Sequence, residues 1–87
     1  QGGEEFVALL RVKDSQELTQ IAERLRQSIG SAPFLIPGGP RKMTISIGCT
    51  LLTPGEQIDD AIKRADGGLY AAKHGGRDQV VYVPALS

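Results

Sequence analysis

The chain has 87 residues, and ten basic residues balance ten acidic ones, so its formal net charge is zero. This length allows one small domain or part of one, with a thin core, because short chains bury a smaller share of their surface. A neutral chain lacks the excess of cations that drives non-specific nucleic-acid binding, so DNA and RNA are not expected partners. The single cysteine, Cys49, excludes an internal disulfide and fits a reducing compartment, and we expect it to fill core space.

A glycine turn followed by two carboxylates, Gly2-Gly3-Glu4-Glu5, stands directly before an apolar run at residues 6–10. Glycines without Cβ atoms let the backbone come close to a phosphate or a base. Carboxylates beside such a turn suit a Mg²⁺ or Mn²⁺ nucleotide site, although a hairpin tip with solvated acids has the same pattern. The apolar run itself predicts a strand covered on both faces.

The middle of the chain predicts a helix, a hairpin and a strand. Asp14 and Glu17 resemble a capping box at the start of an apolar stripe with helical spacing that ends at Gly30. Residues 34–45 contain a Pro-Gly-Gly-Pro turn, which predicts a small hairpin. Alternating apolar and polar side chains at residues 43–50 predict a strand.

A second amphipathic helix is predicted from about Gln57 to the glycine pair at 75–76, followed by a strand at residues 80–83. The glycine pair at 67–68 lies inside this helix, where each glycine costs about 1 kcal/mol relative to alanine. We therefore expect another element to pack closely against that surface. The predicted order is β-α-β-α-β, and no apolar run approaches the roughly 20 residues that span a membrane.

Two cations, Lys73 and Arg77, flank the glycine pair that ends this helix. One interpretation is structural, because a cation in the last turn is stabilised by the helix dipole by about 0.3–1 kcal/mol. The other is a phosphate clamp, with Lys73 as a point charge and Arg77 as a planar fork. His74 has no second histidine or cysteine at ligand spacing and is given no role. Asp66 and Tyr70 are interpreted as structural, Tyr70 as a partly buried phenol with a hydroxyl partner.

Four segments of the chain, taken together, resemble the GGDEF domain of diguanylate cyclases in their order and spacing. They are Gly2-Gly3-Glu4-Glu5-Phe6, Thr44-Ile45-Ser46-Ile47-Gly48, Ala65-Asp66 with Leu69-Tyr70 and Ala72-Lys73, and Gly76-Arg77. The resemblance runs from Gly2 to about Tyr82, and it identifies residues 1–87 as the C-terminal half of a single such domain. It implies an α/β chain of the α+β palm-like type, related to nucleotide cyclases and ferredoxin-like folds.

The resemblance also implies an activity, the condensation of two GTP molecules into cyclic di-GMP with release of pyrophosphate. Each domain binds one GTP, so catalysis requires a homodimer. Glu4, at the third motif position, is the implied metal ligand and catalytic carboxylate for Mg²⁺ or Mn²⁺, and Glu5 is a supporting catalytic residue. Four residues are implied to bind substrate: Gly2, Gly3, Lys73 and Arg77.

Arg24 matches an arginine that binds the product cyclic di-GMP at an inhibitory site in some members of the family, although a solvated charge is the alternative interpretation. The family's last segment reads Gly-Arg-Asn, whereas Asp78 follows Arg77 here. This departure concerns the contact made by the asparagine and leaves the phosphate role of Arg77 in place.

The family's second metal-binding aspartate, its guanine contacts and one hairpin strand precede the glycine motif. We therefore expect the 87 residues alone not to turn over GTP, and their sheet to have a gap that favours strand exchange in a homodimer. A degenerate GGDEF domain that binds GTP or cyclic di-GMP as a regulatory module is the alternative function, and a plain α/β interaction module is a third. The expected location is cytoplasmic, with no membrane contact by this segment and any membrane tether elsewhere in a longer protein.

Overall fold

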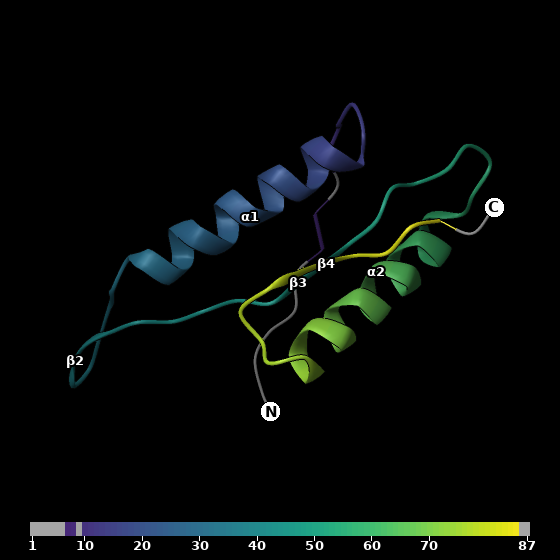
Figure 1. The fold of residues 1–87 in the computed structure, drawn as a ribbon. Helices are drawn as coiled ribbons and strands as arrows, with labels where there is room; N and C mark the ends of the chain where they lie inside the picture. The colour runs from purple at the N-terminus through teal and green to yellow at the C-terminus, as the bar shows by residue number, and fades with distance from the viewer. Residues whose placement is uncertain (1–6, 9, 86–87) are drawn as a thin grey trace.

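The computed structural model describes residues 7–8 and 10–85. Its elements in chain order are α1 (Ser15–Ser31), β1 (Phe34–Ile36), β2 (Gly39–Arg41), β3 (Ile47–Cys49), α2 (Ile58–His74) and β4 (Val80–Tyr82). Both helices contact β3 and β4, and Figure 1 shows these strands between the two helices. The hairpin of β1 and β2 stands at the end of the molecule away from α2 (Figure 1).

Helix α1 begins as its sequence predicts. The Asp14 carboxylate accepts a hydrogen bond from the Glu17 backbone N–H at 2.9 Å, which satisfies one of the free donors of the first turn. Glu17 reaches back to the backbone N–H of Lys13 at 2.6 Å, one residue before the usual position in a capping box. The helix ends at Ser31, one residue beyond the predicted end at Gly30.

Strands β1 and β2 pair antiparallel, with Phe34 opposite Arg41 and Ile36 opposite Gly39. Gly38 and Gly39 have φ values of +100° and +117°, which residues with a Cβ rarely adopt, so the glycines allow the tight turn. The hairpin thus occupies residues 34–41 of the segment in which a hairpin was predicted.

Strands β3 and β4 form a parallel pair, with Ile47 opposite Val80 and Cys49 opposite Tyr82. The predicted strand at residues 43–50 is therefore shortened to three residues, because only those positions have a paired neighbour in β4. Backbone hydrogen bonds extend the ladder at both ends, from Ile47 N–H to the Gln79 carbonyl and from Val83 N–H to the Cys49 carbonyl, each 2.9 Å.

The strand predicted at residues 6–10 is not found where the structure describes the chain. Val7, Ala8 and Leu10 are not in a strand, and the two remaining residues lie outside the described part. The prediction that this run is covered on both faces is also wrong for Val7 and Leu10, which are 67% and 54% exposed. A strand needs a hydrogen-bonded neighbour, and neither Val7, Ala8 nor Leu10 is paired with one of the described strands.

Helix α2 packs against β3 through a contact between two glycines. A Cβ on Gly48 would lie 2.1 Å from both the Ala65 carbonyl oxygen and the Leu69 nitrogen, so only glycine fits. On the helix side, a Cβ on Gly68 would lie 3.3 Å from the Gly48 Cα. The predicted close packing is thus confirmed at Gly68, whereas a Cβ on Gly67 would meet nothing within 4 Å.

Arg64 ties the connection between β3 and α2 to the helix. Its guanidinium donates to the Leu51 carbonyl at 2.7 Å, to the Thr50 hydroxyl at 2.8 Å and to both carboxylate oxygens of Glu56. Glu56 also accepts from the Thr53 backbone N–H at 3.0 Å. The hydrogen bonds from Arg64, followed by that from Thr53, lower the pKa of Glu56 to about 2.

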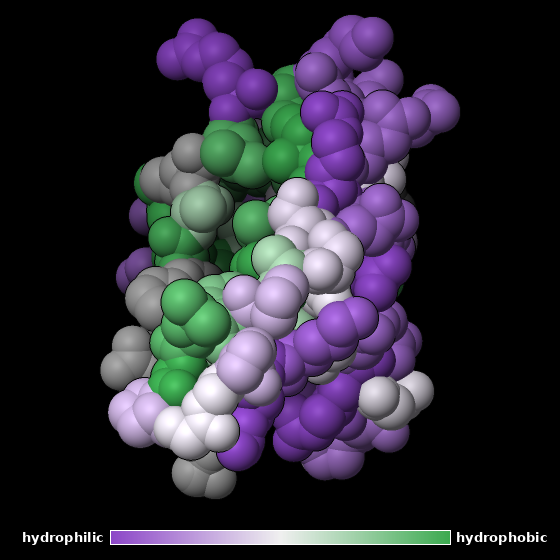
Figure 2. Space-filling model, turned by 90° about the vertical axis from the view of Figure 1, so that its left-hand side faces the viewer, coloured by the Kyte–Doolittle hydropathy of each residue, from purple (hydrophilic) through white to green (hydrophobic). Residues whose placement is uncertain are grey.

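The core is small, as the chain length predicts. The buried apolar residues of the described part are Ala22, Cys49, Ala61 and Ala72. Burial raises the pKa of the Cys49 thiol, which confirms its interpretation as a core residue. Several large apolar side chains remain exposed, Leu35 at 87%, and Figure 2 shows hydrophobic and hydrophilic surfaces side by side at one end of the molecule. Neither described helix is long and apolar enough to cross a membrane.

Candidate phosphate-binding site

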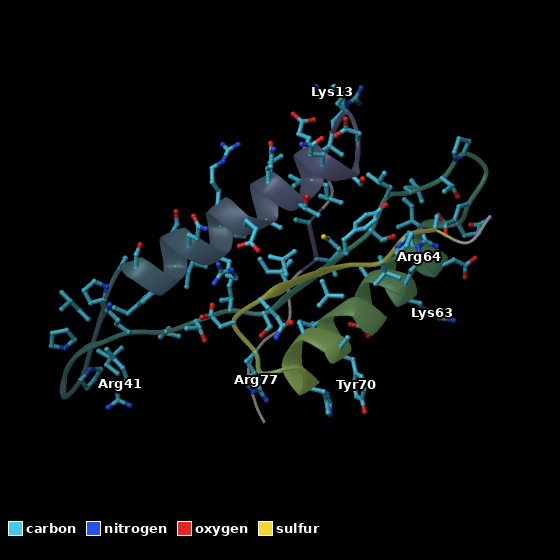
Figure 3. The ribbon with its side chains drawn as sticks, viewed as in Figure 1. Lys13, Arg41, Lys63, Arg64, Tyr70 and Arg77 are labelled. Carbon is cyan, nitrogen blue, oxygen red and sulfur yellow. The ribbon has the colours of Figure 1, made fainter. Side chains whose placement is uncertain are left out.

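The cations predicted to bind phosphate lie where α2 ends. Lys73 is half-buried in the last turn of the helix. Arg77 is exposed on the turn that leads to β4, where Figure 3 labels it. The Gly75 N–H donates to the Ala71 carbonyl at 2.8 Å, and the Arg77 N–H donates to the Ala72 carbonyl at 2.9 Å. These bonds satisfy two of the last four carbonyls of α2 and fix the backbone of Arg77 against the end of the helix.

The cap at the end of α2 has the left-handed glycine that the sequence predicts, at the second of the two glycines. Gly75 has a φ of −90°, whereas Gly76 has a φ of +116°. Together with the bond from the Arg77 N–H to the third-last residue of the helix, Ala72, this arrangement is a Schellman motif. The chain reverses within a few residues, so both cations stay at the same end of the helix.

Arg77 and Asp78 adopt left-handed backbone conformations, with φ values of 63° and 50°. Such conformations cost about 1–2 kcal/mol for each residue that carries a Cβ. The Asp78 N–H donates to the Ser46 hydroxyl at 3.1 Å, and the Gln79 side-chain amide donates to the Arg77 carbonyl at 3.2 Å. The first bond holds the turn against the segment that precedes β3, and the second lies within the turn.

An ion pair joins this turn to α1. The Arg26 guanidinium donates to the Asp78 carboxylate at 2.8 Å and, through Nε, to Glu23 at 2.8 Å. The bond to Asp78, followed by that to Glu23, raises the pKa of Arg26. The Arg26 side chain is 22% exposed. The turn is therefore braced from α1, from the segment before β3 and from α2.

Sequence patterns missed this bracing. Arg26 and Asp78 are 52 residues apart in the chain, and a charge on the polar face of α1 usually faces solvent. The one available signal was the departure from the family pattern at Asp78, since a carboxylate beside a phosphate site needs a cation to neutralise it.

The prediction that Tyr70 is partly buried is wrong. Tyr70 is 66% exposed, and its ring stacks on the imidazole of His74, with centroids 3.9 Å apart. The two residues are one helical turn apart on a surface of α2 that no described element covers, so the ring has an aromatic neighbour and no core around it. Figure 3 shows the Tyr70 side chain pointing away from the strands.

Arg24, the candidate for an inhibitory product site, is exposed on α1. It lines a shallow hollow together with the polar residues Thr19, Gln20, Glu23 and Gln27. This neighbourhood suits a solvated charge as well as a ligand, so the role of Arg24 stays a prediction.

The residues of the opening motif, Gly2, Gly3, Glu4 and Glu5, lie outside the described residues. Their predicted roles in metal and nucleotide binding therefore stay predictions. Within residues 7–8 and 10–85, no group of three or more histidine, cysteine, aspartate or glutamate side chains could hold a metal ion.

An apolar groove of about 210 Å³ lies beside β3. It is lined by Val7 and Leu10 before α1, by Cys49 and the residues after β3, and by α2. Asp66 also lines this groove and is exposed. Among the described strands β3 pairs with β4 alone, so its second edge has no described strand beside it.

The fold is that of a known class of domain. It is similar to the crystal structure of the GGDEF domain of DgcB from Caulobacter crescentus in complex with c-di-GMP, with a TM-score of 0.73 and 27% identity. The similarity covers 80% of this chain and 42% of that chain. The chain therefore has the α+β palm-like fold of such domains.

The family follows from the sequence comparison. The family described as "Diguanylate cyclase, GGDEF domain" matches residues 1–79, so the chain belongs to the GGDEF family. Its relatives include the diguanylate cyclase DgcP of Pseudomonas aeruginosa, which is 42% identical over 79 residues. The diguanylate cyclase DgcM of Escherichia coli is 42% identical over 80 residues, and the response regulator PleD of Caulobacter vibrioides is 39% identical over 83 residues.

The chain covers only a small part of these relatives. The matches to DgcP, PleD and DgcM include 91%, 92% and 92% of this chain but 12%, 18% and 19% of the respective relative. The chain thus spans less than a fifth of the length of each of these three proteins.

Proposed function

We propose that the chain contributes the phosphate-binding part of a diguanylate cyclase domain, which condenses two GTP molecules into cyclic di-GMP and pyrophosphate. The observation that carries the proposal is the end of α2, where Lys73 and Arg77 flank a Schellman turn in a chain of the GGDEF family. The names of the relatives DgcP and DgcM as diguanylate cyclases, and the c-di-GMP in the DgcB structure, support it.

In this proposal the cations act on the leaving group. Each 3′-hydroxyl attacks the α-phosphate of the other GTP and forms a new oxygen–phosphorus bond, while its proton passes to solvent. The bond from the α-phosphorus to the bridging oxygen breaks, and pyrophosphate leaves with the negative charge. Lys73 neutralises this charge as a compact ammonium, and Arg77 donates two parallel N–H groups to phosphate oxygens. Donors fixed in advance on a braced turn lower the barrier because they need not reorganise during the reaction.

Glu4 is proposed to hold a Mg²⁺ or Mn²⁺ ion, with Glu5 supporting it and Gly2 and Gly3 giving the nucleotide access to the backbone. Carboxylate oxygens are the donors these ions prefer, so the chemistry of Glu4 and Glu5 fits the metal. When bound, the metal supplies Lewis-acid stabilisation of phosphate charge.

For the 87 residues alone we propose binding without turnover, because one carboxylate motif leaves a two-metal site short of ligands. A degenerate domain that binds GTP or cyclic di-GMP as a regulatory module is the alternative, with Arg24 as the candidate product contact. The edge of β3 that has no strand beside it among the described residues, together with the apolar groove there, supports a homodimer of this chain formed by strand exchange. Light scattering tests this last point, since a monomer at high concentration would contradict it.

The function is tested in a chimera in which the residues of this chain that match DgcP replace the corresponding segment of that protein. We expect the chimera to form cyclic di-GMP from GTP and Mg²⁺, the chain alone to form none, and Glu4→Ala to abolish formation. An active Glu4→Ala chimera would contradict the proposal that Glu4 is a metal ligand. A chain that forms cyclic di-GMP alone would overturn the proposal of binding without turnover.

A further inference from the structure

The turn that carries Arg77 is held in an unfavourable conformation. Arg77 and Asp78 are consecutive residues with positive φ, 63° and 50°, a region that residues with a Cβ seldom occupy. Such conformations persist where the surroundings impose them, and they are most common where a chain must present a group in one direction. The contacts of this turn therefore bear on what Arg77 does.

Three separate parts of the chain hold the turn. The Arg77 N–H bonds to Ala72 of α2 at 2.9 Å, and the Asp78 N–H bonds to the Ser46 hydroxyl at 3.1 Å. The Asp78 carboxylate accepts from Arg26 of α1 at 2.8 Å. Of these three bonds, the one to Arg26 is the only one that involves the Asp78 side chain and a helix other than α2.

The negative charge of Asp78 is unfavourable beside a phosphate site, so its ion pair with Arg26 needs an explanation. A carboxylate next to Arg77 repels an incoming phosphate unless its charge is compensated. Arg26 compensates part of this charge, since the same guanidinium also pairs with Glu23. Arg26 is itself oriented by Glu23 at 2.8 Å, so the guanidinium that meets Asp78 is fixed at two points.

We infer that Asp78 is a positioning residue, whose ion pair with Arg26 holds the turn so that Arg77 is presented to the terminal phosphates of a nucleoside triphosphate. The inference rests on the proposed function, because it requires Arg77 to bind phosphate. Positioning and simple electrostatics predict opposite signs for the loss of Asp78. Removal of a negative charge strengthens anion binding, whereas release of the turn weakens it.

The test is a titration of the ¹⁵N-labelled 87-residue chain with inorganic pyrophosphate, followed by NMR. We expect Asp78→Ala to weaken binding by about threefold to tenfold, the cost of ordering a side chain and its turn again on binding. Asp78→Asn should bind at least as well as the wild type, because it removes a negative charge, asparagine tolerates the left-handed region and its carbonyl oxygen still accepts from Arg26. Asp59→Ala, a loss of the same charge from the exposed first turn of α2, is the matched control and should not weaken binding.

Wild-type or tighter binding by Asp78→Ala, while Arg77→Ala binds more weakly, would overturn the inference and leave the proposed function standing. No binding by the wild type, or unchanged binding by both Lys73→Ala and Arg77→Ala, would overturn the proposed function and the inference with it.

Arg26→Gln tests the other partner and is decisive if Asp78→Ala does not fold. It should weaken pyrophosphate binding at least as much as Asp78→Ala does, because it also leaves the Asp78 carboxylate unpaired. The double variant should be no weaker than Arg26→Gln, because both changes break the same contact. Additive losses, or full affinity in Arg26→Gln, would contradict the inference.

Discussion

Gly67 and Gly68 are adjacent residues of α2, and the structure surrounds them differently. A Cβ on Gly68 would lie 2.9 Å from Val83 Cγ2 and 3.0 Å from the Val81 carbonyl oxygen. A Cβ on Gly67 would meet nothing within 4 Å. The Val83 methyl can turn aside, but the Val81 carbonyl belongs to β4, so either the strand or the helix must shift to admit a Cβ on Gly68.

The two substitutions Gly67→Ala and Gly68→Ala have the same effect on helix propensity and different effects on packing. Alanine stabilises a helix interior by about 0.8–1 kcal/mol relative to glycine, and this gain is the same at both positions. Only Gly68→Ala adds the cost of overpacking, about 1–3 kcal/mol. Gly67→Ala should therefore raise the free energy of unfolding by about 0.8–1 kcal/mol, and Gly68→Ala should lie about 1–3 kcal/mol below it.

Urea unfolding of both variants, followed by far-ultraviolet circular dichroism, measures this difference. With an m-value of about 1–3 kcal/mol/M, the two midpoints should differ by about 1 M urea. A Gly68→Ala protein as stable as Gly67→Ala would refute the close packing of α2 on β3 and β4. The wild type serves as reference for the gain from helix propensity.

Two further predictions concern stability. The folded-state pKa of Glu56 is depressed, so the stability from its pair with Arg64 is present above the ordinary glutamate pKa of 4.5 and is lost as the pH falls toward about 2. Glu56→Gln should be less stable than the wild type at neutral pH, and thermal unfolding curves of the two should converge over that interval; a constant gap would contradict the assigned pair. Asp14→Ala should lower the free energy of unfolding by about 0.5–2 kcal/mol through loss of the α1 cap. Asp14→Ser should retain most of the stability that the cap provides, because a serine hydroxyl also accepts from the first turn. Equal losses of stability in urea unfolding of the two variants would argue against the cap.

The helices could be predicted because their signals are local. The cap at Asp14 and the glycine that ends α2 act within one turn, and both lie where the sequence places them. The glycine pair at 67–68 predicted close packing because glycine is unfavourable inside a helix. Gly68 contacts Gly48, and the sequence could not predict that Gly48 is the partner.

The strands and the bracing of the site depend on distant residues. Residues 43–50 alternate over eight positions, yet only Ile47–Cys49 form a strand, because a strand is as long as its partner allows. The pair between Arg26 and Asp78 spans 52 residues, and no periodicity reports it. The prediction that Tyr70 is partly buried was wrong for a related reason, since its exposure depends on which elements reach that surface of α2.

The most direct test of the account is the rate of cyclic di-GMP formation by the DgcP chimera when Arg77 is replaced by alanine. Loss of a hydrogen bond to a charged phosphate should lower kcat/KM by about 10- to 100-fold. Arg41→Ala, the loss of an equal charge from the exposed hairpin at β2, should leave it unchanged. An Arg77→Ala chimera as active as the parent chimera would contradict the claim that the end of α2 binds the phosphates of GTP.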